Sequence, residues 1–340
     1  MPSRPPLVIG HRGAPGYRPE HSRSSYELAF AMGVDAVEPD VVASRDGVLV
    51  VRHENEISGT TDVADRPEFA GRRTTKTVDG RRLAGWFTED FTWEELATLR
   101  ARERLPAIRP SSAAFDGSEP LLTLVELLGL VREASADRGR EIGVVLEVKH
   151  ATHFAAAGLD LVPLVERDLR ATGWLDGSRP LVVESFEPTV LARLRERGVP
   201  AAYVSLLEAA GAPFDLVARD GAAARTYAEA VSPDGLDDLA DAVEGISVDK
   251  RMLLERDPFS GQRRAAPLVA AARERGLQVY TWTCRPENAF LAPEFRGAGG
   301  GAAHGDYAGE WRALRDSGVD GVFVDHADLG AQVFRAPSLS

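Results

Sequence analysis

The chain has 340 residues, of which 44% are hydrophobic and 27% charged, as is usual for a globular protein. Forty lysines and arginines stand against 52 aspartates and glutamates, and the net charge of -12 argues against nucleic acid or an anionic membrane as the main partner. One cysteine, Cys284, excludes an intramolecular disulfide. Without a long apolar run or a signal-peptide core, the sequence predicts a cytoplasmic protein with no stable membrane insertion.

Short runs rich in apolar and β-branched residues predict strands along the whole chain. Several are almost wholly apolar, such as Val144-Val145-Leu146, which is typical of parallel strands buried on both faces. In chain order the predicted strands are Leu7–Gly10, Ala36–Val42, Val48–His53, Gly143–Lys149, Leu181–Phe186, Ala201–Leu206, Gly245–Asp249, Gln278–Cys284 and Gly321–Asp325.

Segments with helical periodicity lie between these strands, and most are followed by a glycine, which favours a left-handed C-cap. Repeated β-then-α units predict an α/β fold with a parallel sheet, either open or closed. With roughly eight such units, we expect closure into a TIM (β/α)8 barrel. The predicted helices are Ser24–Met32, Thr123–Ala136, Leu159–Thr172, Pro188–Arg197, Ala265–Arg275 and Glu310–Ser317.

Two features interrupt the alternation of predicted strands and helices. The Asp46-Gly47 turn between the second and third predicted strands is typical of a hairpin, so one of those strands is expected to leave the barrel. Residues 54–120 are rich in charge, threonine and glycine, with one short amphipathic piece at Thr92–Arg100. We interpret them as an inserted lobe at the rim of a single-domain barrel that spans residues 1–340. The alternative is a long loop packed on the outer helices.

Acidic residues fall near the ends of the predicted strands, where barrel active sites form. Glu38 and Asp40 are two residues apart on one strand, so their side chains share a face, and Glu147 shares a face with Lys149 in the same way. Three carboxylates at one rim would repel each other unless a hard divalent cation lay among them. Oxygen ligands suit Mg²⁺ or Ca²⁺ rather than Zn²⁺. The pattern therefore predicts one divalent cation.

Basic residues at the same rim indicate which type of reaction the site would catalyse. Arg12 offers a planar fork for phosphate oxygens, and Lys149 adds a point charge. His11 and His53 can move protons near neutral pH. A cation, an arginine, a lysine and two histidines suit phosphodiester hydrolysis, in which one histidine activates the nucleophile and the other protonates the leaving alkoxide.

These residues resemble the signature of the glycerophosphodiester phosphodiesterases. The likeness covers nearly the whole chain, and its pieces inside residues 54–120 resemble the longer bacterial branch, which is often periplasmic. The matching motifs are His11-Arg12-Gly13, Pro19-Glu20, Glu38-x-Asp40, His53, Thr61–Ala64, Phe87–Leu96, Leu146–Lys149, Ser185-Phe186, Thr281–Thr283 and Asp320–Asp325.

The resemblance implies a TIM barrel with a small inserted domain and a role for each motif residue. It implies a divalent cation held by Glu38, Asp40 and Glu147, with His11 and His53 as the acid–base pair. The remaining roles concern the substrate: Arg12 would clamp the phosphate, Lys149 would assist there, and Phe186 and Trp282 would shape the glycerol pocket.

The chain departs from the family pattern beside two of these motifs. Glu54 follows His53 where the family usually has aspartate, and His21 follows Glu20 where asparagine is common. Neither departure changes a residue with an assigned chemical role. Three further residues have open or structural roles: Glu20 either reaches the cation through water or supports its loop, Glu184 is either a site residue or part of a supporting ion pair, and Asp325 is expected to be structural.

The first functional hypothesis is metal-dependent hydrolysis of a glycerophosphodiester to sn-glycerol 3-phosphate and an alcohol. Either water or the 2-hydroxyl of the substrate could attack. One alternative is a phospholipase D-like lipid phosphodiesterase, which needs an exposed apolar rim. The charged insertion, with its one aromatic cluster at Trp86, Phe87 and Phe91, argues against it. The other alternative is a non-catalytic barrel that binds phosphodiesters, against which the full set of histidines and carboxylates argues.

Overall fold

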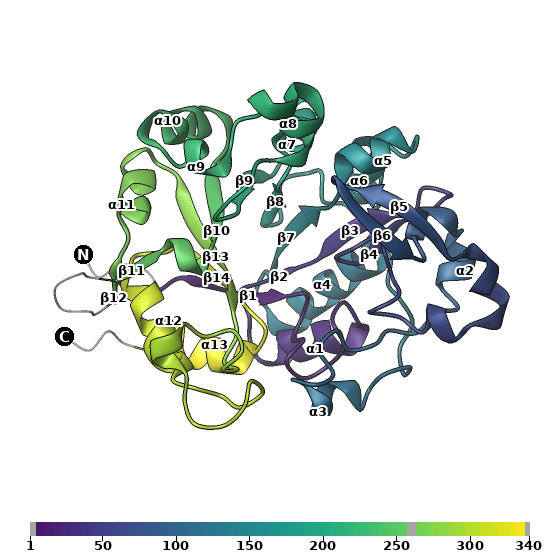
Figure 1. Cartoon of the computed structure of the whole chain (residues 1–340), viewed down its shortest axis with the longest axis horizontal. Helices are drawn as coiled ribbons and strands as arrows, with labels where there is room; N and C mark the ends of the chain where they lie inside the picture. The colour runs from purple at the N-terminus through teal and green to yellow at the C-terminus, as the bar shows by residue number, and fades with distance from the viewer. Residues whose placement is uncertain (1–4, 257–262, 337–340) are drawn as a thin grey trace.

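Eight parallel strands close into a barrel in the computed structural model, which describes residues 5–256 and 263–336 (Figure 1). The ring closes because β1 pairs with both β14 and β2, and β2 pairs in turn with β7. This confirms the predicted TIM barrel. Its strands are β1 (Leu7–His11), β2 (Ala36–Glu38), β7 (Gly143–Val148), β8 (Leu181–Ser185), β9 (Ala202–Leu207), β10 (Gly245–Asp249), β13 (Gln278–Cys284) and β14 (Gly321–Val324).

The predicted strand Ala36–Val42 is two strands separated by Pro39, which has no N–H to donate to a sheet. The second piece, β3 (Asp40–Ala43), pairs in parallel with β7 and antiparallel with β4 (Leu49–Val51). The backbone N–H groups of Ser44 and Gly47 close the connecting turn, in which Gly47 has a φ of 75°. The hairpin is therefore as predicted, with β4 as the strand outside the barrel.

Helices surround the barrel, and each predicted helix is present with ends shifted by at most three residues. Short helices such as α5 (Ala151–Ala156) and α9 (Tyr227–Ala230) were not predicted, because few apolar residues mark their period. The longer α10 (Pro233–Ala242) was also not predicted, although Leu236 and Leu239 lie at helical spacing. The helices outside residues 54–120 are α1 (Arg23–Ala31), α4 (Leu124–Arg138), α5 (Ala151–Ala156), α6 (Leu161–Ala171), α7 (Pro188–Glu196), α8 (Phe214–Asp220), η4 (Gly221–Ala223), α9 (Tyr227–Ala230), α10 (Pro233–Ala242), η5 (Lys250–Met252), α11 (Pro267–Glu274), η6 (Pro293–Phe295), α12 (Tyr307–Asp316) and α13 (Ala327–Phe334). A small ladder, β11 (Leu254–Arg256) and β12 (Arg263–Ala265), lies beside them.

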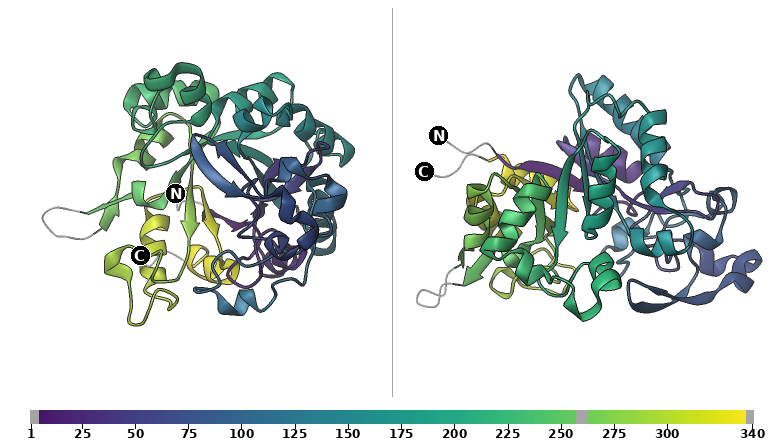
Figure 2. Two further views of the ribbon diagram at one scale, coloured as in Figure 1. Left: turned by 45° about the vertical axis from the view of Figure 1, so that its right-hand side comes forward. Right: turned by 90° about the horizontal axis from the view of Figure 1, so that it is seen from above.

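Residues 54–120, which we interpret as an insertion, fold into short elements on the side of the barrel where β3 and β4 lie (Figures 1 and 2). The hairpin of β5 (Thr74–Val78) and β6 (Arg81–Gly85) is tied to the N-cap of α5, because Asp79 in its turn pairs with His150, and Glu89, shortly after β6, pairs with His153 of α5. The other elements are η1 (Val63–Asp65), η2 (Pro67–Arg72), η3 (Thr88–Asp90), α2 (Trp93–Leu96) and α3 (Pro110–Ala113). Among the described residues, no helix is long and apolar enough to cross a bilayer.

Strand residues that face the barrel axis form a core of their own, separate from the large core between the strands and the helices. A period of two along each strand sends alternate residues to the two sides, so the inner set is small. It consists of Ile9, Ala36, Val145, Val204, Tyr280 and Phe323, with Leu7, Val182 and Trp282 packed against it.

The outer core provides a stability prediction. Trp311 of α12 is fully buried and stacks on Phe334 of α13, with ring centroids 5.7 Å apart. We expect Trp311→Ala to lower the free energy of unfolding by about 3–5 kcal/mol, through lost burial and the cavity left behind. Urea denaturation followed by circular dichroism measures this change. The control is Arg312→Ala, at the exposed neighbouring position, which should change stability by less than about 0.5 kcal/mol; equal losses in both variants would contradict the packing argument.

Candidate active site

Six side chains of the site each come two residues after a strand residue that faces the barrel axis. His11 comes two residues after Ile9 on β1, Glu38 two after Ala36 on β2, and the same step connects the pairs on β7, β8, β13 and β14. Residues two apart share a face, so each side chain points inward at the C-terminal rim. The remaining pairs are Val145 and Glu147, Val182 and Glu184, Tyr280 and Trp282, and Phe323 and Asp325.

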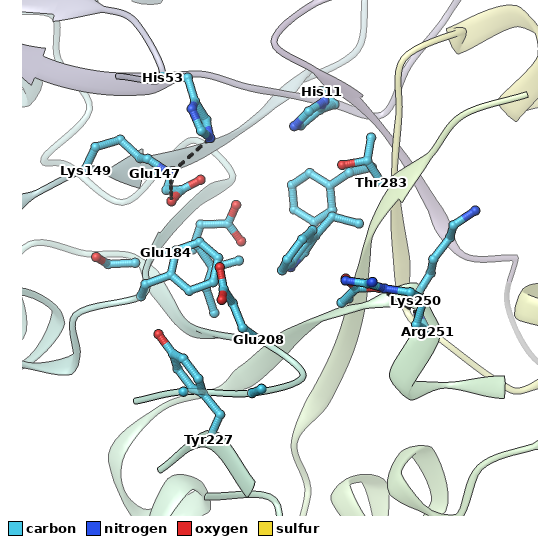
Figure 3. Close-up of a pocket in the computed structure, with 18 of the residues that line it drawn as sticks. His11, His53, Glu147, Lys149, Glu184, Glu208, Tyr227, Lys250, Arg251 and Thr283 are labelled. Carbon is cyan, nitrogen blue, oxygen red and sulfur yellow. Dashed lines mark hydrogen bonds and ion pairs between the residues drawn. The ribbon is translucent and has the colours of Figure 1, made fainter. Parts of the chain in front are cut away.

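A cavity of about 1320 Å³ opens at this rim, and we call it the main cavity. It brings together eight of the nine site residues predicted from the sequence; the ninth, Asp40, is fully buried next to Glu147. Figure 3 shows His11 and His53 on one side, with Glu147 and Glu184 below them. The eight are His11, Arg12, Glu38, His53, Glu147, Lys149, Phe186 and Trp282.

Three buried glutamates converge in the main cavity. Glu38, Glu147 and Glu184 each offer a carboxylate oxygen, and these oxygens lie within 4.8 Å of one another. Oε1 of Glu38 and Oε2 of Glu184 are buried without a hydrogen-bond partner. Burial raises the pKa of each, and neighbouring negative charges add to it, so that the pKa of Glu147 reaches about 8. Such a cluster fits a divalent cation, whose charge would remove the repulsion.

Glu184 therefore stands in the cluster, where the sequence alone left its role open. Asp40, predicted as a ligand, lies beside Glu147 in the β3–β7 register. Its Oδ2 accepts a hydrogen bond from Nε2 of His21 at 2.9 Å and lies 3.3 Å from Nε of Arg12, while Oδ1 has no hydrogen-bond partner. Burial acts to raise the pKa of Asp40, but positive charges nearby and the bond from His21 hold it well below its usual range. Asp40 is thus ionised, and its Oδ1, without a hydrogen bond, lies 3.9 Å from Nζ of Lys149.

His21 is one of the two residues at which the chain departs from the family pattern. It is fully buried, its Nε2 donates to Asp40, and its Nδ1 accepts from the hydroxyl of Tyr26 at 2.8 Å. A carboxylate can only accept, which determines which ring nitrogen carries the proton. The imidazole consequently positions Asp40 from behind the cavity.

The turn after β1 places Arg12 in the site. Arg12 has a φ of 55° and Gly13 a φ of 96°, and a Cβ at Gly13 would lie 2.5 Å from Oγ of Ser25, so only glycine fits there. The backbone N–H of Arg12 donates to Glu38 at 2.9 Å, and its guanidinium donates to Glu20 at 3.1 Å. These contacts hold a buried guanidinium at the edge of the carboxylate cluster.

His11 is fixed by a carboxylate at the opposite end of the chain. Its Nδ1 donates to Oδ1 of Asp325 at 2.6 Å, and the other oxygen of Asp325 accepts from Arg109 and Arg285, each at 2.6 Å. Burial, followed by the charge of Arg12, lowers the pKa of His11 to about 4. The imidazole is therefore neutral at pH 7, and the tautomer leaves Nε2 unprotonated.

Asp325 and Arg109 belong to the site although neither was predicted from the sequence as a site residue. The position of Asp325 at the end of the last strand was a usable signal, since the other strand ends carry site residues. Nothing in the sequence distinguishes Arg109 from the other arginines of residues 54–120. Its partners, Glu287 at 2.7 Å and Asp325, are 178 and 216 residues away.

His53 is held in a similar way from the insertion side. Its Nδ1 donates to Oε1 of Glu54 at 2.6 Å, and Glu54 is itself held by Arg104. Its Nε2 accepts from Nζ of Lys149 at 3.2 Å, and Lys149 also donates to Glu147 at 2.7 Å. Burial, with the charges of Arg12 and Lys149, lowers the pKa of His53 to about 3. Glutamate at position 54 thus orients the imidazole.

Aromatic rings form the part of the cavity next to this cluster. Phe186 meets Trp282 edge to face, with ring centroids 5.8 Å apart, and Nζ of Lys149 lies 5.4 Å from the centre of the Phe186 ring. The indole N–H of Trp282 is buried without an acceptor. The rings offer an apolar surface with one free donor close to the basic and acidic groups.

Comparison with known structures agrees with this class of barrel. An Oleispira antarctica phosphodiesterase, solved in complex with the product sn-glycerol-3-phosphate, superposes with a TM-score of 0.62 at 18% identity, covering 98% of both chains. A glycerophosphodiester phosphodiesterase from Agrobacterium tumefaciens gives a TM-score of 0.57 at 19% identity, covering 96% of this chain and 99% of that one. The protein has the TIM-barrel fold of these phosphodiesterases.

Comparison of sequences identifies the family. Residues 11–329 match the glycerophosphoryl diester phosphodiesterase family. The glycerophosphodiester phosphodiesterase GDPD6 of Arabidopsis thaliana is 32% identical over 339 residues, covering 94% of this chain and 83% of that protein. A glycerophosphodiester phosphodiesterase of Treponema pallidum is 28% identical, with coverages of 83% and 81%. The chain belongs to the glycerophosphoryl diester phosphodiesterase family and is a phosphoric diester hydrolase.

Proposed function

We propose that this enzyme hydrolyses glycerophosphodiesters to sn-glycerol 3-phosphate and an alcohol, using one divalent cation and a pair of histidines. The observation that carries the proposal is the buried cluster of Glu38, Glu147 and Glu184 in the same cavity as two imidazoles, each bonded to a carboxylate. The sn-glycerol-3-phosphate bound as product by the Oleispira antarctica enzyme supports the choice of product.

Glu38, Asp40 and Glu147 would hold the cation, and Glu184 is close enough to contribute an oxygen. The donors are all carboxylate oxygens, which suits Mg²⁺ or Ca²⁺. The cation would supply positive charge to the phosphoryl oxygens as negative charge develops on them.

The basic groups would bind the phosphate. Arg12 is held by Glu20 on one side and lies 3.3 Å from Asp40 on the other, so little side-chain freedom is lost when it meets a ligand. Lys149 lies between Glu147 and His53 and would add a second donor. Both groups would stabilise the charge of the transition state.

His11 and His53 would transfer the protons. Both are neutral in the free enzyme at pH 7, since their pKa values are lowered to about 4 and about 3. An anionic phosphodiester between them favours the protonated form of a nearby imidazole. One histidine would then take the proton of the nucleophile and the other would donate to the leaving alkoxide.

Phe186 and Trp282 would shape the glycerol pocket. Their rings stand nearly perpendicular, at 82°, and offer an apolar corner for the carbon chain, and the indole N–H of Trp282 is free to donate to a glycerol hydroxyl. This arrangement supplies one specific polar contact in an apolar setting, as small-molecule sites commonly do.

The test is a panel of glycerophosphodiesters assayed for released sn-glycerol 3-phosphate, with and without a chelator. Release that needs Mg²⁺ or Ca²⁺ is expected. Binding without turnover in saturating cation would instead identify a non-catalytic barrel. Activity on micellar lipid alone would indicate a lipid phosphodiesterase, but among the described residues the exposed large hydrophobic side chains are Val125 and Val217, too few for a bilayer-docking rim.

Asp325 provides a prediction about a positioning residue. Asp325→Asn removes the carboxylate that keeps the proton of His11 on Nδ1, and we expect kcat to fall by about 10²–10³-fold with little change in KM. Nitrogen-15 NMR should show that the His11 ring has lost its single tautomer, a signal that a purely structural role would not change. The control is Asp328→Asn, an exposed carboxylate bonded to Tyr17. An unchanged kcat in Asp325→Asn would contradict the assignment.

A further inference from the structure

One wall of the main cavity is both acidic and aromatic. We define the acidic wall as Asp79, Phe186, Glu187, Glu208 and Tyr227, all of which line the cavity. They come from the β5–β6 turn, the loop after β8, the end of β9 and the start of α9. In Figure 3, Glu184 and Glu208 lie between His53 and Tyr227, so this wall continues from the proposed catalytic centre.

Two carboxylates of the acidic wall have an unused oxygen. Glu187 is 4% exposed; its Oε2 accepts from the backbone N–H and the hydroxyl of Thr152, and its Oε1 has no hydrogen-bond partner. Asp79 bonds to His150 through Oδ2, while its buried Oδ1 also has no partner. A buried acceptor without a donor costs free energy, which a bound donor or cation would recover.

The acidic wall also lacks matching positive charge. Within the described residues, no lysine or arginine lies within ion-pair distance of Glu187 or Glu208. Several basic side chains elsewhere around the same cavity are matched by carboxylates of the protein, and Arg81 and Arg296, which also line it, form no ion pair with Glu187 or Glu208. The matched pairs are Lys250 with Glu310, Arg251 with Asp249, and Arg285 with Asp325. Negative charges around Tyr227, from Glu208, Asp215, Glu187 and Asp79, add to burial in raising its pKa.

The spacing of these carboxylates does not suit a metal ion. In the described part of the chain, the only three acidic or metal-ligating groups with ligand atoms within 4.8 Å of one another are Glu38, Glu147 and Glu184. Aromatic rings line the same part of the cavity, where Phe186 meets Tyr227 edge to face with centroids 6.4 Å apart. Dispersed carboxylates with aromatic faces suit an organic ammonium ion.

We propose that the acidic wall is a subsite for the ammonium group of an amino alcohol, so that the preferred substrates are glycerophosphodiesters of choline or ethanolamine type. The inference rests on the proposed function. Phe186 would separate the two halves of the substrate, with glycerol on the side of Trp282 and the amino alcohol on the side of Tyr227. Glu187 and Glu208 would neutralise the ammonium charge.

The experiment compares kcat/KM for glycerophosphocholine and glycerophosphoethanolamine with kcat/KM for the neutral-alcohol diesters of glycerol and inositol. In the wild-type enzyme the cationic substrates should be favoured. In Glu187→Gln and Glu208→Gln, kcat/KM should fall by about tenfold for cationic substrates and by less than about twofold for neutral ones. Glu208 is exposed, so its variant should fold normally. Glu133→Gln, an exposed residue of α4, controls for the change in net charge.

A binding measurement separates this inference from the proposed function. Calorimetry with tetramethylammonium should show binding to the wild type that is weakened in both variants. Turnover of all diesters with no preference for cationic ones, or a preference unchanged in both variants, would overturn the subsite while leaving the phosphodiesterase activity intact. If no diester is hydrolysed, the proposed function fails, and the tetramethylammonium result still decides the subsite: binding lost in Glu208→Gln supports it, and no binding to the wild type refutes it.

Discussion

Replacement of His11 by alanine should lower kcat for sn-glycerol 3-phosphate release by about 10³–10⁴-fold, the upper part of the range for a lost proton-transfer group. The imidazole is neutral and held in one tautomer by Asp325, so its free nitrogen is ready to exchange a proton. His53→Ala should have an effect of similar size, because His53 is likewise fixed, between Glu54 and Lys149.

The measurement is single-turnover and steady-state release of sn-glycerol 3-phosphate, with circular dichroism to verify folding. His304→Ala is the matched control, because His304 is exposed and packs on His326 and Tyr307 without lining the main cavity. Partial recovery of His11→Ala by added imidazole would show that the lost group is a proton carrier. Full activity of either His11→Ala or His53→Ala would refute the role given to that residue.

Removal of the divalent cation is expected to have the second large effect. Chelation should reduce turnover by at least about 10²-fold, and Mg²⁺ or Ca²⁺ should restore it, because the phosphate charge would otherwise face uncompensated carboxylates. A cation that binds only the folded state also stabilises it, by about 2.7 kcal/mol at a concentration one hundred times its Kd. The melting temperature should therefore rise on adding the cation to chelated enzyme.

Glu38→Gln separates this cation effect from general damage. It removes one of three mutually repelling buried carboxylates, so the chelated variant should be at least as stable as the chelated wild type. It should nevertheless lose most activity and most of the stabilisation by the cation. Glu133→Gln should keep both. A cation-dependent melting temperature that is unchanged in Glu38→Gln would refute Glu38 as a ligand, and wild-type activity that survives thorough chelation would refute the cation requirement.

Most of the barrel was predictable because its signals are local. Apolar runs identified the strands, glycines identified the helix ends, and the Asp46-Gly47 turn identified the β3–β4 hairpin. The error at Ala36–Val42 came from reading a strand through Pro39, although proline cannot donate to a ladder. Short helices such as α9 carry too few apolar residues for a period to be seen.

The candidate site likewise has a part that could be predicted from the sequence and a part that could not. Eight predicted site residues line one cavity because strand-end position and the period of two are both visible in the sequence. The membership of Glu184 in the carboxylate cluster was not visible, since Glu147 and Glu184 become neighbours only when β7 pairs with β8. The position of Asp40 beside the cluster depends on contacts with His21 and Arg12, which come from another part of the chain.

The sequence by itself determined the repeating β–α units, the closure expected of eight of them, and the residues that face inward at the rim, because all of these follow from periodicity along the chain. Only the tertiary structure decided which groups hold these rim residues in place through hydrogen bonds. His11 and Asp325 are 314 residues apart, and Arg109 reaches Asp325 across 216 residues. Hydrogen bonds between such distant residues leave no periodic trace, since they form only after the barrel closes and β14 pairs with β1.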